Sequence, residues 1–270
     1  MCRTVLVWSL KIWLLGSGSI IPTAKRSYSS VLLELAGEKI LIDIGPATIY
    51  KLCRSGSRLC EINQLLLSHF HIDHVADYLP LIHSKAFDPE TGEIAPKGTL
   101  DVYGPKGLVK FTTDLLEKVE PWNRVADSLN CSGYLTLCEV EQGIFTRNQN
   151  WTGLAAPVHH AGGVAYRIEA DGKSVTYSGD TIPDDNLIKL AKGTDTLVHE
   201  CSFPSEEFLV GLHTTATQLG HIAAKAECKR LVLTHLYPVC ETRTAEMVSR
   251  VSQDYGGEII VADDYMELTI

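Results

Sequence analysis

Four potential metal ligands lie within six residues of the chain, at positions 69–74, where the sequence reads His-Phe-His-Ile-Asp-His. They are His69, His71, Asp73 and His74. Imidazole and carboxylate groups suit borderline divalent ions such as zinc. Four ligands so close together crowd one tetrahedral site, so the motif predicts two neighbouring metal ions. A solvated polar turn is the alternative, but a chance run of three histidines is improbable when only 10 of 270 residues are histidine.

The flanking residues place this cluster on a turn between a strand and a helix. The short apolar run Ile62–Ser68 predicts a buried strand, and the run Val75–Ile82 predicts the start of a helix. His69 and His71 point the same way on an extended backbone, because successive side chains alternate between faces. The two ligands that follow can face a second point nearby as the chain curls. Two metal ions need further ligands, which have to come from elsewhere in the chain.

Strands and helices follow one another in both halves of the sequence. The predicted strands are Leu10–Gly16, Ser30–Ala36, Lys39–Ile44, Ile62–Ser68, Leu100–Tyr103, Tyr134–Val140, Val164–Ala170, Ser174–Ser178, Asp195–His199, Arg230–Thr234, Glu258–Val261 and Met266–Ile270. The predicted helices are Pro46–Arg54, a segment from the metal turn to about Lys85, Lys106–Glu120, Asp184–Ala191, Thr215–Ala226 and Glu241–Gln253. Each half is mainly strands followed by helices, which indicates two sheets packed face to face with helices outside.

Composition and charge narrow the class of protein. With 45% hydrophobic and 21% charged residues the chain is typical of a soluble globular protein, and we expect one domain over residues 10–270, preceded by an extension (1–9) without an assigned role. Nothing in the sequence approaches a transmembrane span. The net charge of −9 disfavours broad binding to nucleic acid, although a small basic patch stays compatible with it.

The cysteines indicate a compartment. The chain has eight of them, and none forms a C-x-x-C pair. In a chain of this length, scattered cysteines without an export signal are expected to be free thiols in a reducing environment. The sequence therefore predicts a cytoplasmic protein.

Three further segments could complete the metal site, because each ends a predicted strand with a ligand residue. They are Pro157–His160, Tyr177–Thr181 and Leu231–His235. His159 and His160 compete for one ligand position. Asp180 could instead cap the following turn, and His235 could be a hydrogen-bonded core histidine. With the first motif these segments give five histidines and two aspartates, enough for two ions if one carboxylate bridges them.

These motifs together resemble those of the metallo-β-lactamase-fold hydrolases, and within them the ribonuclease Z and arylsulfatase-like branch. The matching segments are Gly16–Ser19, Leu41–Gly45, His69–His74, Tyr103–Gly107, Ser178–Thr181, His199–Phe203, His213–Thr215 and Leu233–His235. The pattern of His199-Glu200 followed by His213-Thr-Thr is the narrower mark of the ribonuclease Z-like branch. The resemblance implies an α+β fold, a four-layer αββα sandwich of two packed mixed sheets with outer helices.

The resemblance also implies a ligand set. It assigns one metal to His69, His71, His159 and a bridging Asp180, and a second to Asp73, His74, Asp180 and His235. Between the two adjacent histidines we choose His159 over His160, since this branch usually places an aromatic residue seven positions after the ligand and Tyr166 fits that spacing. Zinc is the preferred ion, with manganese or iron as alternatives.

A catalytic scheme follows from these assignments. Two metals about 3.5–4 Å apart can lower the pKa of a shared water from about 15.7 towards roughly 7. Asp73 can orient that water and take its proton. By the resemblance, His213 protonates the leaving oxygen and Glu200 polarises His213. The alternative for His213 is a loop histidine that merely caps the helix after Thr215.

The sequence says less about the substrate than about the type of reaction. Ribonuclease Z enzymes usually carry an RNA-gripping arm between the third histidine motif and the bridging aspartate, but here His159 and Asp180 are only 21 residues apart. We therefore expect a phosphodiesterase acting on a small-molecule phosphodiester or related ester, with nucleic acid not favoured. The alternatives are an arylsulfatase, a lactonase or a β-lactamase on the same site, and, less favoured, a non-enzymatic or redox metal protein. The loops Phe87–Lys97 and Trp122–Cys131 could cover the substrate, and the resemblance favours a homodimer.

Overall fold

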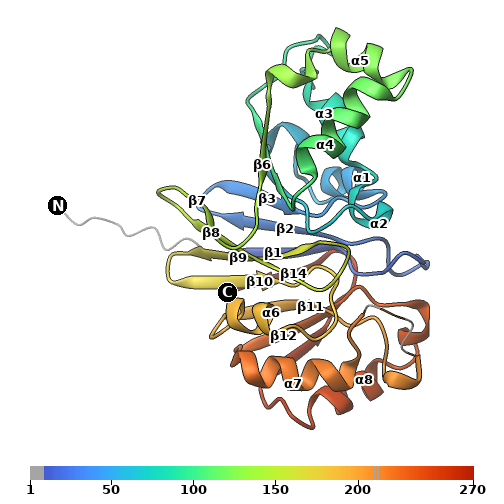
Figure 1. The fold of residues 1–270 in the computed structure, drawn as a ribbon, viewed down its shortest axis with the longest axis vertical. Helices are drawn as coiled ribbons and strands as arrows, with labels where there is room; N and C mark the ends of the chain where they lie inside the picture. Colours follow the sequence, from blue (N-terminus) through green and yellow to red (C-terminus); the bar gives the residue numbers. More distant parts are fainter. Residues whose placement is uncertain (1–8, 209–210, 212) are drawn as a thin grey trace, which may run out of the picture.

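Two seven-stranded sheets lie face to face in the computed structural model, which describes residues 9–208, 211 and 213–270. Helices cover the outer side of each sheet (Figure 1). This four-layer arrangement confirms the predicted αββα sandwich of two packed mixed sheets. Of the predicted N-terminal extension, residues 1–8 lie outside the described residues.

The first sheet collects the strands of the N-terminal half and one strand from the C-terminus. Its order is β14 (Met266–Thr269), β1 (Lys11–Gly16), β2 (Ser30–Leu35), β3 (Glu38–Ile42), β4 (Ile62–Leu66), β5 (Leu100–Gly104) and β6 (Leu135–Glu139). Pairing is antiparallel from β14 to β3 and parallel from β3 to β6. The β2–β3 hairpin turns at Ala36 and Gly37, both with positive φ, as a tight two-residue turn requires.

The second sheet is built from the remaining strands. Its order is β13 (Glu258–Val261), β12 (Arg230–Thr234), β11 (Thr196–Glu200), β10 (Lys173–Tyr177), β9 (Val164–Ala170), β8 (Thr152–Pro157) and β7 (Gly143–Arg147). Pairing is parallel from β13 to β10 and antiparallel from β10 to β7. The parallel strands leave their carboxyl ends at one edge of the sheet, where loops can carry functional side chains.

Alternating side chains divide the apolar residues between the layers. On β1, Ile12 and Leu14 join the core between the two sheets, whereas Trp13 and Leu15 face the helices outside. This is the period of two that a strand buried on both faces must show. The core between the sheets also contains Tyr177, which reaches from β10 towards the first sheet.

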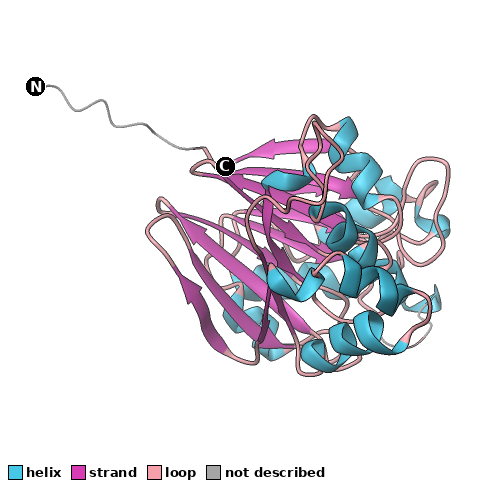
Figure 2. Cartoon of the chain, turned by 90° about the horizontal axis from the view of Figure 1, so that it is seen from above, coloured by secondary structure: helices cyan, strands magenta, loops and turns pink. Residues whose placement is uncertain are grey.

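Two groups of helices close the outer faces (Figure 2). The first sheet is covered by α1 (Thr48–Arg54), α2 (Ile72–Val75), α3 (Tyr78–Lys85), α4 (Leu108–Thr113) and α5 (Trp122–Ser128), and the second by α6 (Asp185–Leu190), α7 (Ala216–Ala226) and α8 (Thr244–Val251). Among the described residues, no helix combines the length and the apolar character that a membrane crossing requires.

Three sequence predictions differ from the structure. Strands β7 and β8 were not predicted, because β7 is an edge strand with largely exposed residues, and β8 consists mainly of Gly, Ala and Pro, which have low strand propensity. The predicted helix Lys106–Glu120 begins only at Leu108 and widens into a π-helical turn at Asp114–Lys118. Most of the predicted loop Trp122–Cys131 is helix α5.

Candidate metal centre

The predicted ligand segments meet at one rim of the molecule, although they come from both sheets. Residues 69–74 follow β4 of the first sheet. His160, Asp180 and His235 follow β8, β10 and β12 of the second sheet. Because β10 and β12 run parallel, with β11 between them, their carboxyl ends deliver side chains to the same edge.

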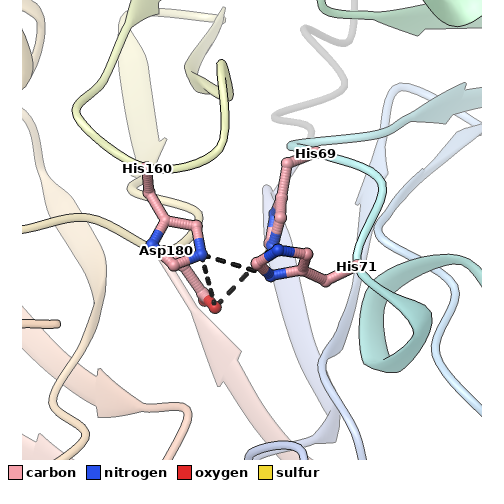
Figure 3. Close-up of side chains that lie close together, drawn as sticks. All are labelled: His69, His71, His160 and Asp180. Carbon is pink, nitrogen blue, oxygen red and sulfur yellow. Dashed lines mark hydrogen bonds and ion pairs between the residues drawn. The ribbon is translucent and has the colours of Figure 1, made fainter. Parts of the chain in front are cut away.

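The first group of side chains comprises His69, His71, His160 and Asp180, whose ligand atoms lie within 4.8 Å of one another (Figure 3). Asp180 Oδ2 is 3.8 Å from His69 Nε2 and 3.9 Å from His160 Nε2. His160 Nε2 lies 3.2 Å from His71 Nδ1. The three imidazoles and the carboxylate thus converge on one point.

A second group shares Asp180 with the first. It comprises Asp73, His74, Asp180 and His235, again within 4.8 Å. His74 Nε2 lies 3.3 Å from Asp180 Oδ1, and His235 Nε2 lies 3.3 Å from Asp180 Oδ2. His235 Nε2 is also 3.4 Å from Asp73 Oδ2. Asp180 therefore offers both carboxylate oxygens between the two groups.

Both groups fit divalent metal ions. Atoms about 2.05 Å from a shared tetrahedral ion are separated by roughly 3.3 Å, which is close to the spacing within the second group. His69 Nε2, a buried atom that faces these groups, has no hydrogen-bond partner among the described residues, and His74 Nε2 and Asp180 Oδ1 face each other at 3.3 Å without hydrogen-bond geometry. A buried polar atom left unpaired costs about 1–3 kcal/mol, so a bound cation would relieve an otherwise unfavourable arrangement.

The preference for His159 over His160 is wrong in the structure. The side chain of His159 is 72% exposed and bonds through Nδ1 to Asp184, the N-cap residue of α6. His160 takes the expected position. Strand β8 ends at Pro157, and the chain then turns, with the backbone amide of His160 donating to the carbonyl of Val158. This turn, and not the alternation of the strand, directs His160 into the site.

Tyr166 lies seven residues after His159 for a reason unrelated to metal binding. Tyr166 is a core residue of β9, fully buried, and its hydroxyl donates to the carbonyl of Leu67. Its position reflects packing between the sheets and does not mark the ligand.

Burial and charge act in opposite directions on the titratable groups of the site. Burial lowers the pKa of His69 well below its usual value, with help from the positive charge of His74. Burial also opposes a charge on His74, but the carboxylates of Asp180 and Asp43 outweigh it and raise that pKa. A metal ion that binds His74 must therefore displace a proton.

Glu200 and His213 form a pair beside the second group. His213 Nδ1 lies 3.0 Å from Glu200 Oε1, and the backbone amide of Thr181 donates to the same oxygen at 2.9 Å. Burial disfavours the imidazolium of His213, but the hydrogen bond and negative charge of Glu200 outweigh it and raise the pKa of His213. The ring of His213 stacks on that of His235 with centroids 5.3 Å apart, so this imidazole lies beside the candidate metal ligands.

Sequence reasoning gave no role to three buried polar residues that contact the ligands. They are Asp43, Ser68 and Ser202. Asp43 lies within the apolar segment Leu41–Gly45, and a carboxylate amid such residues is a signal in itself, since burying a charge is costly without partners. The two serines carried no comparable signal.

The two packed mixed sheets give the chain the metallo-β-lactamase fold, with clusters at their rim that could hold metal ions, and its sequence is similar to that of ribonuclease Z proteins. The family model described as anti-Pycsar protein Apyc1 matches residues 10–250, and the chain belongs to that family.

Individual proteins agree with this class. Ribonuclease Z of Methanosarcina acetivorans is 28% identical over 97% of this chain and 98% of its own length. The metallo-β-lactamase-fold protein YhfI of Bacillus subtilis has a TM-score of 0.79 at 22% identity, covering 97% of this chain and all (100%) of that one. Zinc-bound PqqB of Methylobacterium extorquens has a TM-score of 0.73 at 17% identity, covering 96% and 100% of the two chains.

Proposed function

We propose that the chain is a phosphodiesterase that binds two divalent metal ions and hydrolyses a small phosphodiester. The observation that carries the proposal is Asp180, whose two oxygens lie between two groups of ligands. His69, His71, His160 and Asp180 would hold one ion, and Asp73, His74, Asp180 and His235 the other. When bound, two such ions supply an acidified water and positive charge for the attacked group.

Asp73 is proposed to orient the attacking water and to accept its proton. Burial raises the cost of ionising this carboxylate, but its contact with His235 and the charge of His74 outweigh it and lower the pKa of Asp73. The carboxylate is therefore ionised at neutral pH, as a proton acceptor must be.

His213 is proposed to protonate the leaving oxygen. Its Nδ1 faces Glu200, which leaves Nε2 for a substrate. The raised pKa of His213 keeps this imidazole protonated near neutral pH, which a general acid requires. An alkoxide leaving group of a phosphodiester needs such a proton, whereas a lactone or an aryl ester needs it less. The pair therefore favours phosphodiester hydrolysis over the arylsulfatase, lactonase and β-lactamase alternatives.

Two observations support a small substrate over RNA. Between His160 and Asp180 the chain forms β9 and β10, joined by the turn Asp171-Gly172, which leaves little room there for an arm. The net charge of −9 adds no general attraction for a polyanion. The relative named Ribonuclease Z supports the phosphodiester as the bond attacked.

Metal identity, assembly and location are further parts of the proposal. The nitrogen and oxygen ligands favour zinc, with manganese or iron as alternatives. The seven described cysteines are free thiols, which supports a cytoplasmic location. A homodimer is proposed from the resemblance, and sedimentation of the purified chain tests it.

A panel of substrates tests the proposed reaction. Bis-p-nitrophenyl phosphate, p-nitrophenyl sulfate, a simple lactone, a chromogenic β-lactam and a transfer RNA precursor with a 3′ extension are each given to the zinc-loaded protein. We expect turnover of the phosphodiester and little cleavage of the RNA. Turnover of only the sulfate, lactone or β-lactam would replace the phosphodiesterase proposal with that activity.

A further inference from the structure

Two buried carboxylates each reach two histidines of the site, one directly and one through a serine. Asp43 lies 2.7 Å from His74 Nδ1, and the Ser68 hydroxyl donates to the same carboxylate at 2.8 Å. The Ser68 oxygen in turn lies 3.0 Å from His69 Nδ1. Asp43 is thus linked to one ligand of each metal group, directly to His74 and through Ser68 to His69.

The second sheet repeats this arrangement. Glu200 lies 3.0 Å from His213 Nδ1, and the Ser202 hydroxyl donates to its other oxygen at 2.6 Å. The Ser202 oxygen lies 3.0 Å from His235 Nδ1. All of these side chains except His213 are almost fully buried, so water does not compete for the contacts.

Counting protons fixes the direction of each contact. A serine hydroxyl has one hydrogen, and an ionised carboxylate only accepts. Ser68 donates its hydrogen to Asp43, and Ser202 donates to Glu200 at 2.6 Å in preference to the carbonyl of His235 at 3.4 Å. Each serine oxygen then accepts from the facing imidazole. His69 and His235 therefore carry a proton on Nδ1, and in the neutral ring Nε2 keeps its lone pair. Those Nε2 atoms are the ones that lie 3.8 and 3.3 Å from Asp180.

We propose that Ser68 and Ser202 are positioning residues that hold His69 and His235 in the metal-binding tautomer, by linking each ring to a buried carboxylate. This inference rests on the metal binding of the proposed function. The serines touch neither metal nor substrate, and they act through the imidazoles. A partner behind a ligand typically changes metal affinity by about 10–100-fold when it is removed.

The Glu200–Ser202–His235 arrangement differs from the Asp43–Ser68–His69 arrangement in one respect. Glu200 contacts His213, the proposed acid, directly, and it is linked through Ser202 to His235, a proposed metal ligand. One carboxylate therefore supports both proton donation and metal binding. Loss of Ser202 should disturb the ligand while leaving the Glu200–His213 contact in place. Metal affinity and acid catalysis can therefore be separated by substitution.

Zinc affinity of the Ser202 variants tests the inference. Ser202→Ala removes the hydroxyl, Ser202→Thr retains it, and Ser205→Ala is the matched control, since Ser205 is buried in the same loop and has no hydrogen-bond partner among the described residues. Chelator competition should show one of two zinc-binding steps weakened about 10–100-fold in Ser202→Ala, and unchanged in Ser202→Thr and Ser205→Ala. Wild-type affinity in Ser202→Ala would overturn the inference.

Ser68 provides an independent arm of the same experiment. Ser68→Ala should weaken one zinc-binding step, and the double variant Ser68→Ala/Ser202→Ala should weaken both. If the double variant shows only the same weakened zinc-binding step as Ser202→Ala, the proposal that each serine supports a separate metal ligand is wrong. Thermal unfolding of the metal-free proteins verifies that each variant folds. If Ser202→Ala does not fold, it is replaced by Ser202→Cys, which fills the same space with a weak hydrogen-bonding group.

Nitrogen-15 spectra of the imidazoles give a readout apart from affinity. In the zinc-loaded wild type, the Nδ1-bound proton of His235 should exchange slowly with solvent, and Ser202→Ala should accelerate that exchange. A proton found on Nε2 of His235 in the metal-free protein at high pH, with Nδ1 bare, would overturn the tautomer assignment. If the wild type binds no metal, the proposed function fails together with the inference. If the wild type binds two ions and the serine variants behave like it, the inference alone fails.

Discussion

Asp180 is the central residue of the candidate site, because it lies between histidines from both sheets. Burial alone would favour its neutral form, but the charges of His235 and His74 outweigh burial and hold the pKa of Asp180 well below its usual range. It is therefore an ionised carboxylate at 3% side-chain exposure, surrounded by imidazoles. Such a buried charge is tolerated only where cations or donors compensate it.

The two adjacent histidines give a sharp comparison at the residue scale. His160→Ala should lose one of the two metal ions, together with most of the activity, because it removes a ligand atom from the first group. His159→Ala should keep both ions, since its side chain faces solvent and Asp184. Metal analysis of the two variants after dialysis checks this, and equal metal loss in both would contradict it.

His213 should control turnover and its dependence on pH. His213→Ala should lower kcat about 100- to 10,000-fold with both metals retained, because only the leaving-group proton is lost. The activity of the wild type should fall as pH rises through the raised pKa of His213, since the acid form is lost above it. The pH profile of His213→Ala should lack this fall in activity.

His221→Ala serves as the matched control for His213. His221 lies on α7, with a side chain that is 63% exposed and pairs with Asp254. Its substitution should change neither kcat nor the pH profile. A falling limb at the same pH in His213→Ala would assign that limb to another group.

Most of the candidate site could be predicted residue by residue, because ligand residues at strand ends are visible in the sequence. Asp73, His74, Asp180 and His235 lie together as expected. The choice between His159 and His160 failed because both lie in a turn after β8, where neither strand alternation nor a family spacing shows which side chain enters the site. The contacts of Ser68 and Ser202 could not be foreseen, since they depend on how loops from strands distant in sequence pack.

At the scale of elements, the end of β3 is as important as the metal turn. Asp43 follows β3 with a φ of 55° and zero exposure, and it accepts hydrogen bonds from Ser68 and Tyr177. Tyr177 belongs to the second sheet, so this carboxylate connects both sheets behind the ligands. A positive φ at a non-glycine residue is uncommon and persists where the surroundings fix it.

Asp43→Asn should therefore destabilise the fold. The amide group would face donors that need an acceptor, and we expect a loss of about 3 kcal/mol in the free energy of unfolding. Asn tolerates this backbone conformation, so the cost is not one of strain. Urea unfolding of the metal-free protein measures it.

Asp171→Asn is the control for this substitution. Asp171 also has a positive φ, 49°, but it is exposed in the β9–β10 turn. Its change should stay within about 0.5 kcal/mol. Equal effects at the two positions would show that backbone conformation, and not the buried hydrogen bonds, dominates.

Elements with strong apolar patterns could be predicted, and weakly patterned ones could not. Strands β9, β12 and β13 have the bounds expected from the sequence. Strand β7 was missed because its exposed edge residues carry no alternation. Helix α5 was missed because only Ala126 of its residues is buried, so the sequence shows no apolar stripe that would predict a helix.

At the scale of the whole molecule, the site joins the two sheets. Residues 69–74 come from the first sheet and His160, Asp180 and His235 from the second, while β14 returns the end of the chain to the first sheet. The packing of two sheets could be predicted from the order of elements, but the return of β14 could not, because strand order is set by long-range pairing.

Metal binding should therefore stabilise the whole fold. An ion at about 1,000 times its Kd adds roughly 4 kcal/mol, because only the folded chain assembles the ligands. We expect zinc to raise the Tm of the wild type in a single transition, which also tests the proposal that residues 10–270 form one domain. His213→Ala should show the same rise, and Asp180→Ala should show much less. Two separate transitions, with only one sensitive to zinc, would contradict a site that joins both sheets.

The most direct test of the central claim is metal content measured beside hydrolysis of bis-p-nitrophenyl phosphate, for the wild type and for Asp180→Ala. We expect close to two metal ions per chain and clear phosphodiester hydrolysis in the wild type, with both the full metal content and the activity lost in Asp180→Ala. A wild type that takes up no stoichiometric metal, even after reconstitution with zinc or manganese, would contradict the claim.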